Sequence, residues 1–156
     1  QTREMSRVYQ ALASGDLAGK GTVDAPIGRH PRDRKRMAVV ASGKPAVSHY
    51  RALKRFGDAT HVEVSLESGR THQIRVHMAH IGHPLIGDPV YGHKPRAPSA
   101  VTEMQFEAMR AFPRQALHAF RLRLVHPDSS GAVTFEAPLP EDMVKLLSCL
   151  RENEQS

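Results

Sequence analysis

The sequence contains no tryptophan and only one cysteine, Cys149, among its 156 residues. A single cysteine cannot form a disulfide framework, and it excludes a zinc or iron–sulfur site built mainly from cysteine. No apolar run approaches the roughly 20 residues that a membrane-spanning helix requires, and no signal-peptide pattern is visible. These absences favour a cytoplasmic protein with no membrane partner. The length suits one domain with a modest hydrophobic core.

Positive charge is the first indication of a partner. Lysine and arginine total 22 against 16 for aspartate and glutamate, which gives a net charge of +6. Of these cations 16 are arginines, whose planar fork of donors suits phosphate groups and base edges. Nucleic acid is therefore a better candidate partner than an acidic small molecule or a membrane.

Five of the cations lie in one short polar segment. Residues 29–36 read Arg-His-Pro-Arg-Asp-Arg-Lys-Arg, which is too polar for a packed element, and we expect an exposed loop. Its cations are Arg29, Arg32, Arg34, Lys35 and Arg36. Such a loop can bind backbone phosphates without reading the base sequence. The alternative is a solvated charged loop that binds nothing.

The hydrophobic pattern predicts strands first and helices later. Alternating polar and apolar residues predict strands over 7–13, 45–56, 61–66 and 117–125, with shorter strands at 37–40 and 133–135. The Gly57-Asp58 turn predicts a hairpin between the second and third of these. Helical spacing predicts helices over 71–81, 102–110 and 140–151, the first with Thr71 as its N-cap. This order favours an α+β fold with a mixed, mostly antiparallel sheet flanked by helices.

The densest group of polar side chains runs from Gly69 to Gly92, where the pattern changes from strand to helix. It begins Gly-Arg-Thr-His-Gln-Ile-Arg-Val-His-Met and contains two arginines and four histidines. Free N–H groups at a helix start, together with Arg70 and Arg75, favour a bound anion. If Arg75 is buried, it needs a carboxylate or a phosphate as its partner.

The histidines of this segment raise the alternative of a metal site. His77, His80 and His83 recur every three residues, whereas helical zinc sites prefer an i, i+4 pair with a third ligand from elsewhere. We therefore expect no metal. We expect histidines that pack, cap the helix or, like His72, contact phosphate.

Tyr9 has two open interpretations, as a half-buried packing residue or as a residue that stacks on a base.

The Gly69–Gly92 stretch, with its Gly-Asp-Pro-Val-Tyr-Gly end, resembles the signature of the RluA family of RNA pseudouridine synthases. Residues 29–39, 43–51, 114–119 and 135–138 resemble the RluD branch of that family, which modifies large-subunit ribosomal RNA. The resemblance covers nearly the whole chain. It implies an enzyme that isomerises uridine to pseudouridine without a metal or an organic cofactor.

The same resemblance implies roles for two residues. It assigns to Arg75 the arginine that pairs with the catalytic aspartate, and to Tyr9 the tyrosine that stacks on the target uracil. That aspartate belongs to a His-Arg-Leu-Asp motif upstream of the tyrosine, and none of the eight residues before Tyr9 is an aspartate. We therefore expect the carboxylate partner of Arg75 to come from outside this chain.

These features predict that residues 1–156, which begin with Gln1, are the C-terminal part of a synthase catalytic domain, incomplete at its N-terminal side. We expect the fragment to be inactive alone, and the whole enzyme to act on ribosomal RNA as a monomer in the cytoplasm. The RNA ligands we expect are the five loop cations together with Arg70 and His72. The alternatives are a non-catalytic RNA-binding module, or degenerate synthase relative, and a histidine-ligated metalloprotein.

Overall fold

A six-stranded sheet with the strand order β2-β5-β6-β1-β7-β8 dominates the computed structural model, which describes residues 4–92, 97–125 and 131–152. The strands are β1 (Glu4–Ser14), β2 (Lys20–Asp24), β5 (Val47–Arg55), β6 (Ala59–Leu66), β7 (Leu117–Val125) and β8 (Ala132–Glu136). Neighbouring strands of this described sheet are antiparallel throughout. The predicted α+β fold with a mostly antiparallel sheet is therefore confirmed.

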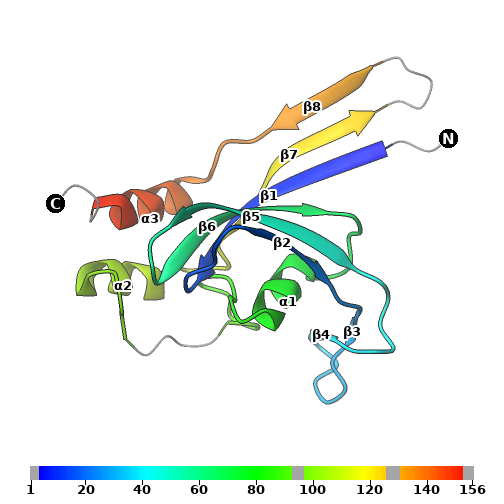
Figure 1. Ribbon diagram of the computed structural model, residues 1–156, viewed down its shortest axis with the longest axis horizontal. Helices are drawn as coiled ribbons and strands as arrows, with labels where there is room; N and C mark the ends of the chain where they lie inside the picture. Colours follow the sequence, from blue (N-terminus) through cyan, green and yellow to red (C-terminus); the bar gives the residue numbers. More distant parts are fainter. Residues whose placement is uncertain (1–3, 93–96, 126–130, 153–156) are drawn as a thin grey trace.

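A small hairpin and three helices complete the fold. The hairpin consists of β3 (Ile27–Arg29) and β4 (Met37–Val39), and the helices are α1 (Gln73–His80), α2 (Glu103–Arg110) and α3 (Glu141–Arg151). In Figure 1, α1 lies below the sheet beside the β3–β4 hairpin, while α2 and α3 lie together on the left. None of the helices in the described part of the chain is long and apolar enough to cross a bilayer.

Strand β1 contributes to two hydrophobic cores. Ala11 and Ala13 belong to the core that includes α1, whereas Leu12 belongs to the core that includes α2 and α3. Successive side chains of a strand point to opposite faces of the sheet, so one short apolar run holds helices on both faces. All three residues are fully buried. Packing on both faces therefore holds β1, the strand that carries Tyr9, in place.

The predicted hairpin of β5 and β6 is confirmed, and its turn also anchors α2. Gly57 adopts a positive φ of 93° in this turn. The Asp58 carboxylate accepts hydrogen bonds from the hydroxyl and N–H of Ser99 and from the N–H groups of Ala100 and Val101. The turn therefore holds the segment that leads into α2.

The three predicted helices are present with shifted ends. A capping box of Thr102 and Gln105 starts α2. The apolar stripe of α3 is buried and consists of Met143, Leu146, Leu147 and Leu150. The predicted N-cap of α1 is wrong, because His72 rather than Thr71 occupies that position.

Burial changes the protonation of His61 on β6. Its Nε2 donates a hydrogen bond to Oε1 of Gln10 at 2.9 Å. Loss of hydration, together with the positive charge of Arg151, lowers the pKa of His61 to about 4. The folded protein therefore keeps this ring neutral at pH values where the unfolded chain protonates it.

We predict that the free energy of unfolding falls as the pH drops from about 6.5 to about 4. In this range the unfolded chain binds more protons at His61 than the folded chain does, so acid favours unfolding. Urea unfolding at several pH values measures this slope. His61→Gln should make the slope shallower, because glutamine keeps a donor for Gln10 but does not titrate. It should not abolish the slope, since burial also lowers the pKa of His72 and of His77. His80→Gln, which changes an exposed residue of α1, should keep the wild-type slope. An unchanged slope in His61→Gln would contradict the prediction.

Candidate active site

A cavity of about 360 Å³ brings together the two residues predicted to be catalytic. We call it the Tyr9–Arg75 cavity. Polar residues of its wall are Arg7 and Tyr9 from β1, Arg70, His72, Gln73 and Arg75 at the start of α1, and Gln115 before β7. No aspartate or glutamate is among the described residues that line it. The cavity is therefore rich in cations and lacks an acid of its own.

Tyr9 reaches this cavity from the middle of β1. It is half-buried and pairs with Val64 on β6 and with Ala119 on β7. The register between β1 and β7 shifts between Val8 and Tyr9. Such bulges twist a strand locally and re-aim its side chains, so the irregularity sets the direction of the tyrosine.

Arg75 is held by a carboxylate from the loop that follows α1. Its Nε donates to Oδ2 of Asp88 and its Nη2 donates to Oδ1, both at 2.9 Å. The arginine side chain is 10% exposed and the aspartate side chain 0%. Hydrogen bonding to Asp88 raises the pKa of Arg75. Burial raises the pKa of Asp88, but hydrogen bonds from Arg75, Tyr91 and Val90 outweigh burial and lower it overall.

The expectation that the carboxylate partner of Arg75 comes from outside this chain is wrong, because Asp88 of the same chain forms a buried ion pair with it. The segment after α1 folds back beneath the helix and brings in Asp88 from only 13 residues away. Gly87 makes the turn possible, because it has a φ of 77° and a Cβ there would lie 2.0 Å from the carbonyl oxygen of Arg114. Residues with a side chain do not fit this position.

Asp88 does not use all the donors of Arg75. A guanidinium carries five N–H groups, and the Nη1 group has no hydrogen-bond partner among the described residues. Asp88 itself is fully covered, and it also accepts hydrogen bonds from the N–H groups of Val90 and Tyr91. It is therefore an anchor for Arg75 rather than a nucleophile. The Nη1 group of Arg75 therefore has capacity for a further hydrogen-bond acceptor, and Arg75 lines the cavity.

His72 lies at the wall of the same cavity in an unusual backbone conformation. It has a φ of 56° and is the only non-glycine residue with a positive φ in the described ranges. This conformation costs about 1 kcal/mol or more. Its Nδ1 lies 2.8 Å from the hydroxyl of Tyr91. Burial and the nearby charge of Arg75 lower the pKa of His72.

A chain of buried hydrogen bonds fixes α1 against the sheet. Nε2 of Gln73 donates to the carbonyl of Val47 and to the hydroxyl of Ser48, both at 3.0 Å. His77 Nε2 donates to the carbonyl of Ala25 at 2.9 Å, so its Nδ1 accepts from Ser48 at 2.7 Å. Both ring nitrogens of His77 are therefore engaged within the protein. The described residues include no group of three histidine, cysteine, aspartate or glutamate side chains that could hold a metal ion.

The basic segment of residues 29–36 consists of Arg29, the last residue of β3, and the loop that leads to β4. Most of its cations are exposed. Arg29, Arg32, Arg34 and Lys35 face solvent, whereas Arg36 is partly buried. A hydrogen bond within the segment stabilises its conformation, because Nη1 of Arg29 donates to the carbonyl of Arg34 at 2.8 Å. The expectation of an exposed basic loop is confirmed for four of its five cations.

A groove of about 440 Å³ runs between the β3–β4 hairpin and the start of α1. Its cations are Arg29, Lys44 and Arg70. Arg70 also lines the Tyr9–Arg75 cavity, and its Nε donates to the carbonyl of Pro45 at 2.9 Å. A positively charged path therefore leads from the hairpin to the cavity. Lys44 was not predicted as part of this path, because it lies outside the run of charge at 29–36.

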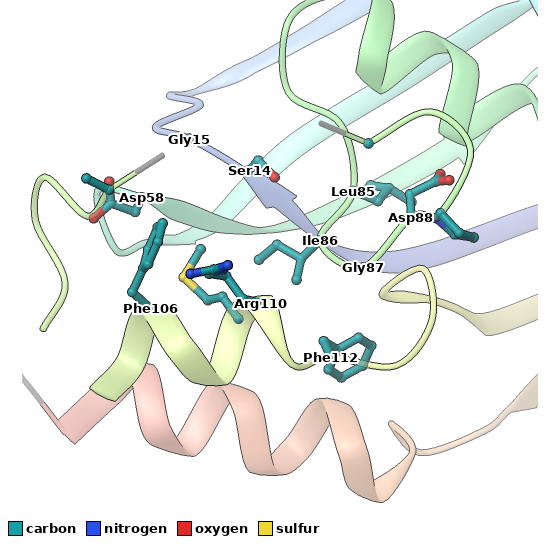
Figure 2. A pocket seen from close by; sticks show the side chains of 14 residues that line it. Ser14, Gly15, Asp58, Leu85, Ile86, Gly87, Asp88, Phe106, Arg110 and Phe112 are labelled. Atoms are coloured by element: carbon teal, nitrogen blue, oxygen red, sulfur yellow. The ribbon is translucent and has the colours of Figure 1, made fainter. Parts of the chain in front are cut away.

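A second cavity, of about 520 Å³, lies near α2 and has a different character. Figure 2 shows Phe106, Arg110 and Phe112 on the side that faces Ile86. Its wall includes none of the residues predicted to be functional, and Asp58 there is already engaged by the segment before α2. We therefore assign the candidate active site to the Tyr9–Arg75 cavity.

Comparison with known proteins identifies the class to which this fold and cavity belong. A profile of the family described as RNA pseudouridylate synthase matches residues 1–80. Human RNA Pseudouridylate Synthase Domain Containing 4 superposes with a TM-score of 0.71 at 25% identity, over 94% of this chain and 62% of that one. Human RNA Pseudouridylate Synthase Domain Containing 1 gives a TM-score of 0.67 at 28% identity, over 94% of this chain and 66% of that one. The chain belongs to the RNA pseudouridylate synthase family.

Bacterial relatives are more similar in sequence. The chain is 54% identical to the Ribosomal large subunit pseudouridine synthase D of Pseudomonas aeruginosa over 156 residues, which is 100% of this chain and 49% of the relative. It is also 54% identical to the protein of the same name from Escherichia coli K12 over 151 residues, which is 97% of this chain and 46% of the relative. The chain spans about half the length of these relatives.

We predict that Asp88→Asn destabilises the protein by about 3–5 kcal/mol, because it leaves the Arg75 guanidinium buried without a countercharge. Urea unfolding at neutral pH measures the change. Asp16→Asn is the control, since Asp16 makes a similar two-point ion pair with Arg55 at the surface, where both side chains are about half exposed. Water screens that pair, so its loss should leave the midpoint near wild type. Equal effects of the two substitutions would contradict the prediction.

Proposed function

We propose that this chain supplies the C-terminal part of the catalytic domain of a synthase that converts uridine to pseudouridine in large-subunit ribosomal RNA. The observation that carries the proposal is the Tyr9–Arg75 cavity, where a half-buried tyrosine and an anchored arginine share a wall without a carboxylate. The 54% identity to proteins named Ribosomal large subunit pseudouridine synthase D supports the substrate class. Action as a monomer and a cytoplasmic location stay predictions.

The proposed reaction explains why an acid must be added to this cavity. The N1–C1′ bond of uridine breaks, the uracil turns, and a C5–C1′ bond forms. The proton on C5 leaves and N1 gains a proton, so atoms and electrons balance without an oxidant. An ionised aspartate suits covalent attack on the sugar or the base. The free Nη1 group of Arg75 would bind that aspartate and lower its pKa.

The surroundings of the cavity suit an extruded nucleotide. A base must leave its stack to reach an enclosed site, and aromatic side chains such as Tyr9 stack well on unpaired bases. The groove with Arg29, Lys44 and Arg70 would hold flanking phosphates. The exposed loop cations add a contact that does not depend on base sequence.

Pseudouridine formation on a ribosomal RNA fragment tests the proposal. We predict activity for the full-length enzyme that contains this chain and none for residues 1–156 alone, which lack the aspartate motif. In the full-length enzyme, Arg75→Lys should lower kcat by at least about 100-fold while RNA affinity changes less than about threefold, because lysine cannot bridge two carboxylates with a planar fork. Arg55→Lys, at an exposed ion pair, is the control and should match wild type.

Three results would count against the proposal. Pseudouridine formed by residues 1–156 alone would show that no further acid is needed. Equal losses of turnover and of RNA affinity in Arg75→Lys would show that Arg75 binds RNA rather than a catalytic carboxylate. RNA binding without pseudouridine formation by the full-length enzyme would favour the alternative of a non-catalytic RNA-binding protein.

We predict that the basic loop contributes affinity that depends on salt. Replacing Arg32, Arg34 and Lys35 by glutamine should weaken RNA binding and reduce the slope of log affinity against log salt by about 2, since each lost phosphate contact removes roughly 0.7–0.9. Titrations at several salt concentrations measure this slope. Lys145→Gln on α3, whose side chain is 73% exposed, is the control. An unchanged slope in the triple variant would exclude the loop from the RNA interface.

A further inference from the structure

Tyr91 is a buried tyrosine at the end of the Gly69–Gly92 stretch. Its position in the sequence predicts no role for it. It is 8% exposed and packs with Ile27, Ala46 and Val76 in the small core between α1 and the β3–β4 hairpin. A tyrosine there does more than fill space, because both its hydroxyl group and its ring contact residues of the candidate site and the basic loop.

The hydroxyl group of Tyr91 joins the hairpin to the start of α1. It accepts a hydrogen bond from the N–H of Met37, the first residue of β4, at 2.9 Å. Its own hydrogen is therefore free to bond Nδ1 of His72, 2.8 Å away. His72 accepts at Nδ1 only when that nitrogen is unprotonated, which leaves the hydrogen of the neutral ring on Nε2. One oxygen thus sets the tautomer of His72 and the position of β4.

The ring of Tyr91 contacts two guanidinium groups. The Cζ of Arg75 lies 5.0 Å from the ring centre and the Cζ of Arg36 lies 5.2 Å from it. Cations within about 6 Å of an aromatic ring are attracted to its face. Nε of Arg36 is buried without a hydrogen-bond partner in the described structure, so the ring is an important restraint on this guanidinium.

The backbone of Tyr91 completes the connection. Its N–H donates to Oδ1 of Asp88 at 3.0 Å, the same oxygen that accepts from Nη2 of Arg75. A single residue therefore touches the last cation of the basic loop, the first residue of β4, the N-cap of α1 and the Arg75–Asp88 ion pair. A shift of the hairpin must move Tyr91, and a shift of Tyr91 must disturb Arg75 and His72.

We propose that Tyr91 is a positioning residue that couples RNA docking on the basic loop to the orientation of Arg75 and His72 in the cavity. This inference rests on the proposed function. Arg36 is the point at which the loop acts on Tyr91, because it is the loop cation that packs against the ring. The exposed loop cations add affinity, whereas Arg36 also affects the catalytic step through Tyr91.

A double-mutant cycle in the full-length enzyme tests this coupling. With Tyr91 present, Arg36→Gln should lower kcat by about 10-fold, because the ring loses one of its two cations and the cavity residues shift. In a Tyr91→Leu background, whose own kcat is already reduced, the same change should lower kcat less than about twofold. KM for RNA should rise in both backgrounds, since the loop loses a charge either way. If Tyr91 had a purely structural role, the effect of Arg36→Gln on kcat would not depend on whether Tyr91 is present.

Two further variants sharpen the cycle. Lys35→Gln removes an exposed cation of the same loop, and its effects on kcat and KM should be identical in the two backgrounds. Tyr91→Phe keeps the ring and loses the hydroxyl, so it should recover most of the coupling to Arg36 but not the restraint on His72. Thermal unfolding of each variant identifies those that fold. If Tyr91→Leu fails to fold, the same cycle is run with Tyr91→Met, whose flexible, unbranched side chain adapts to the space of the ring without being aromatic.

The outcomes separate the coupling from the proposed function. Effects of Arg36→Gln on kcat that are equal in both backgrounds would overturn the coupling while an active wild type upholds the function. A full-length wild type that forms no pseudouridine overturns the function and the coupling with it. A kcat loss confined to the background with the Tyr91 ring supports the proposal.

Discussion

The ion pair between Arg75 and Asp88 is the interaction on which the rest of the site depends. Burying a guanidinium costs several kcal/mol unless a carboxylate and further hydrogen bonds compensate it, and Asp88 meets that need with two bonds of 2.9 Å. The pair ties the segment after α1 back onto the helix. It fixes the arginine before any substrate arrives, so the remaining donors are already in place.

Around this pair the fold places in separate regions the residues that the proposed RNA modification needs. The two cores that meet at β1 hold Tyr9 and α1 rigidly. The β3–β4 hairpin projects its cations outside the main sheet, and the groove lined by Lys44 and Arg70 joins the hairpin to the cavity. Cations gather in both places, but the described wall of the cavity has no acid. This imbalance supports the proposal that the site is one part of a larger active site.

The sequence predicted the elements better than their contacts. Alternation predicted most strands because one face of each of them is buried. Family resemblance predicted roles for Tyr9 and Arg75, and both residues line the same cavity. It did not reveal Asp88 as the anchor, because a Gly-Asp-Pro loop has no periodicity that indicates which side chain it will meet. The proposed role of Tyr91 depends on contacts with the basic loop, β4, the start of α1 and the loop that carries Asp88. Only the tertiary structure brings these segments together.

The distance from Nη1 of Arg75 to the nearest carboxylate oxygen, in a crystal structure of the full-length enzyme, tests the central claim most directly. The account predicts an aspartate from outside residues 1–156 at about 2.7–2.9 Å from Nη1, as in a charge-assisted hydrogen bond, with the Asp88 pair still intact. A structure in which Nη1 faces only solvent, or in which Asp88 is the only carboxylate within reach, would contradict it.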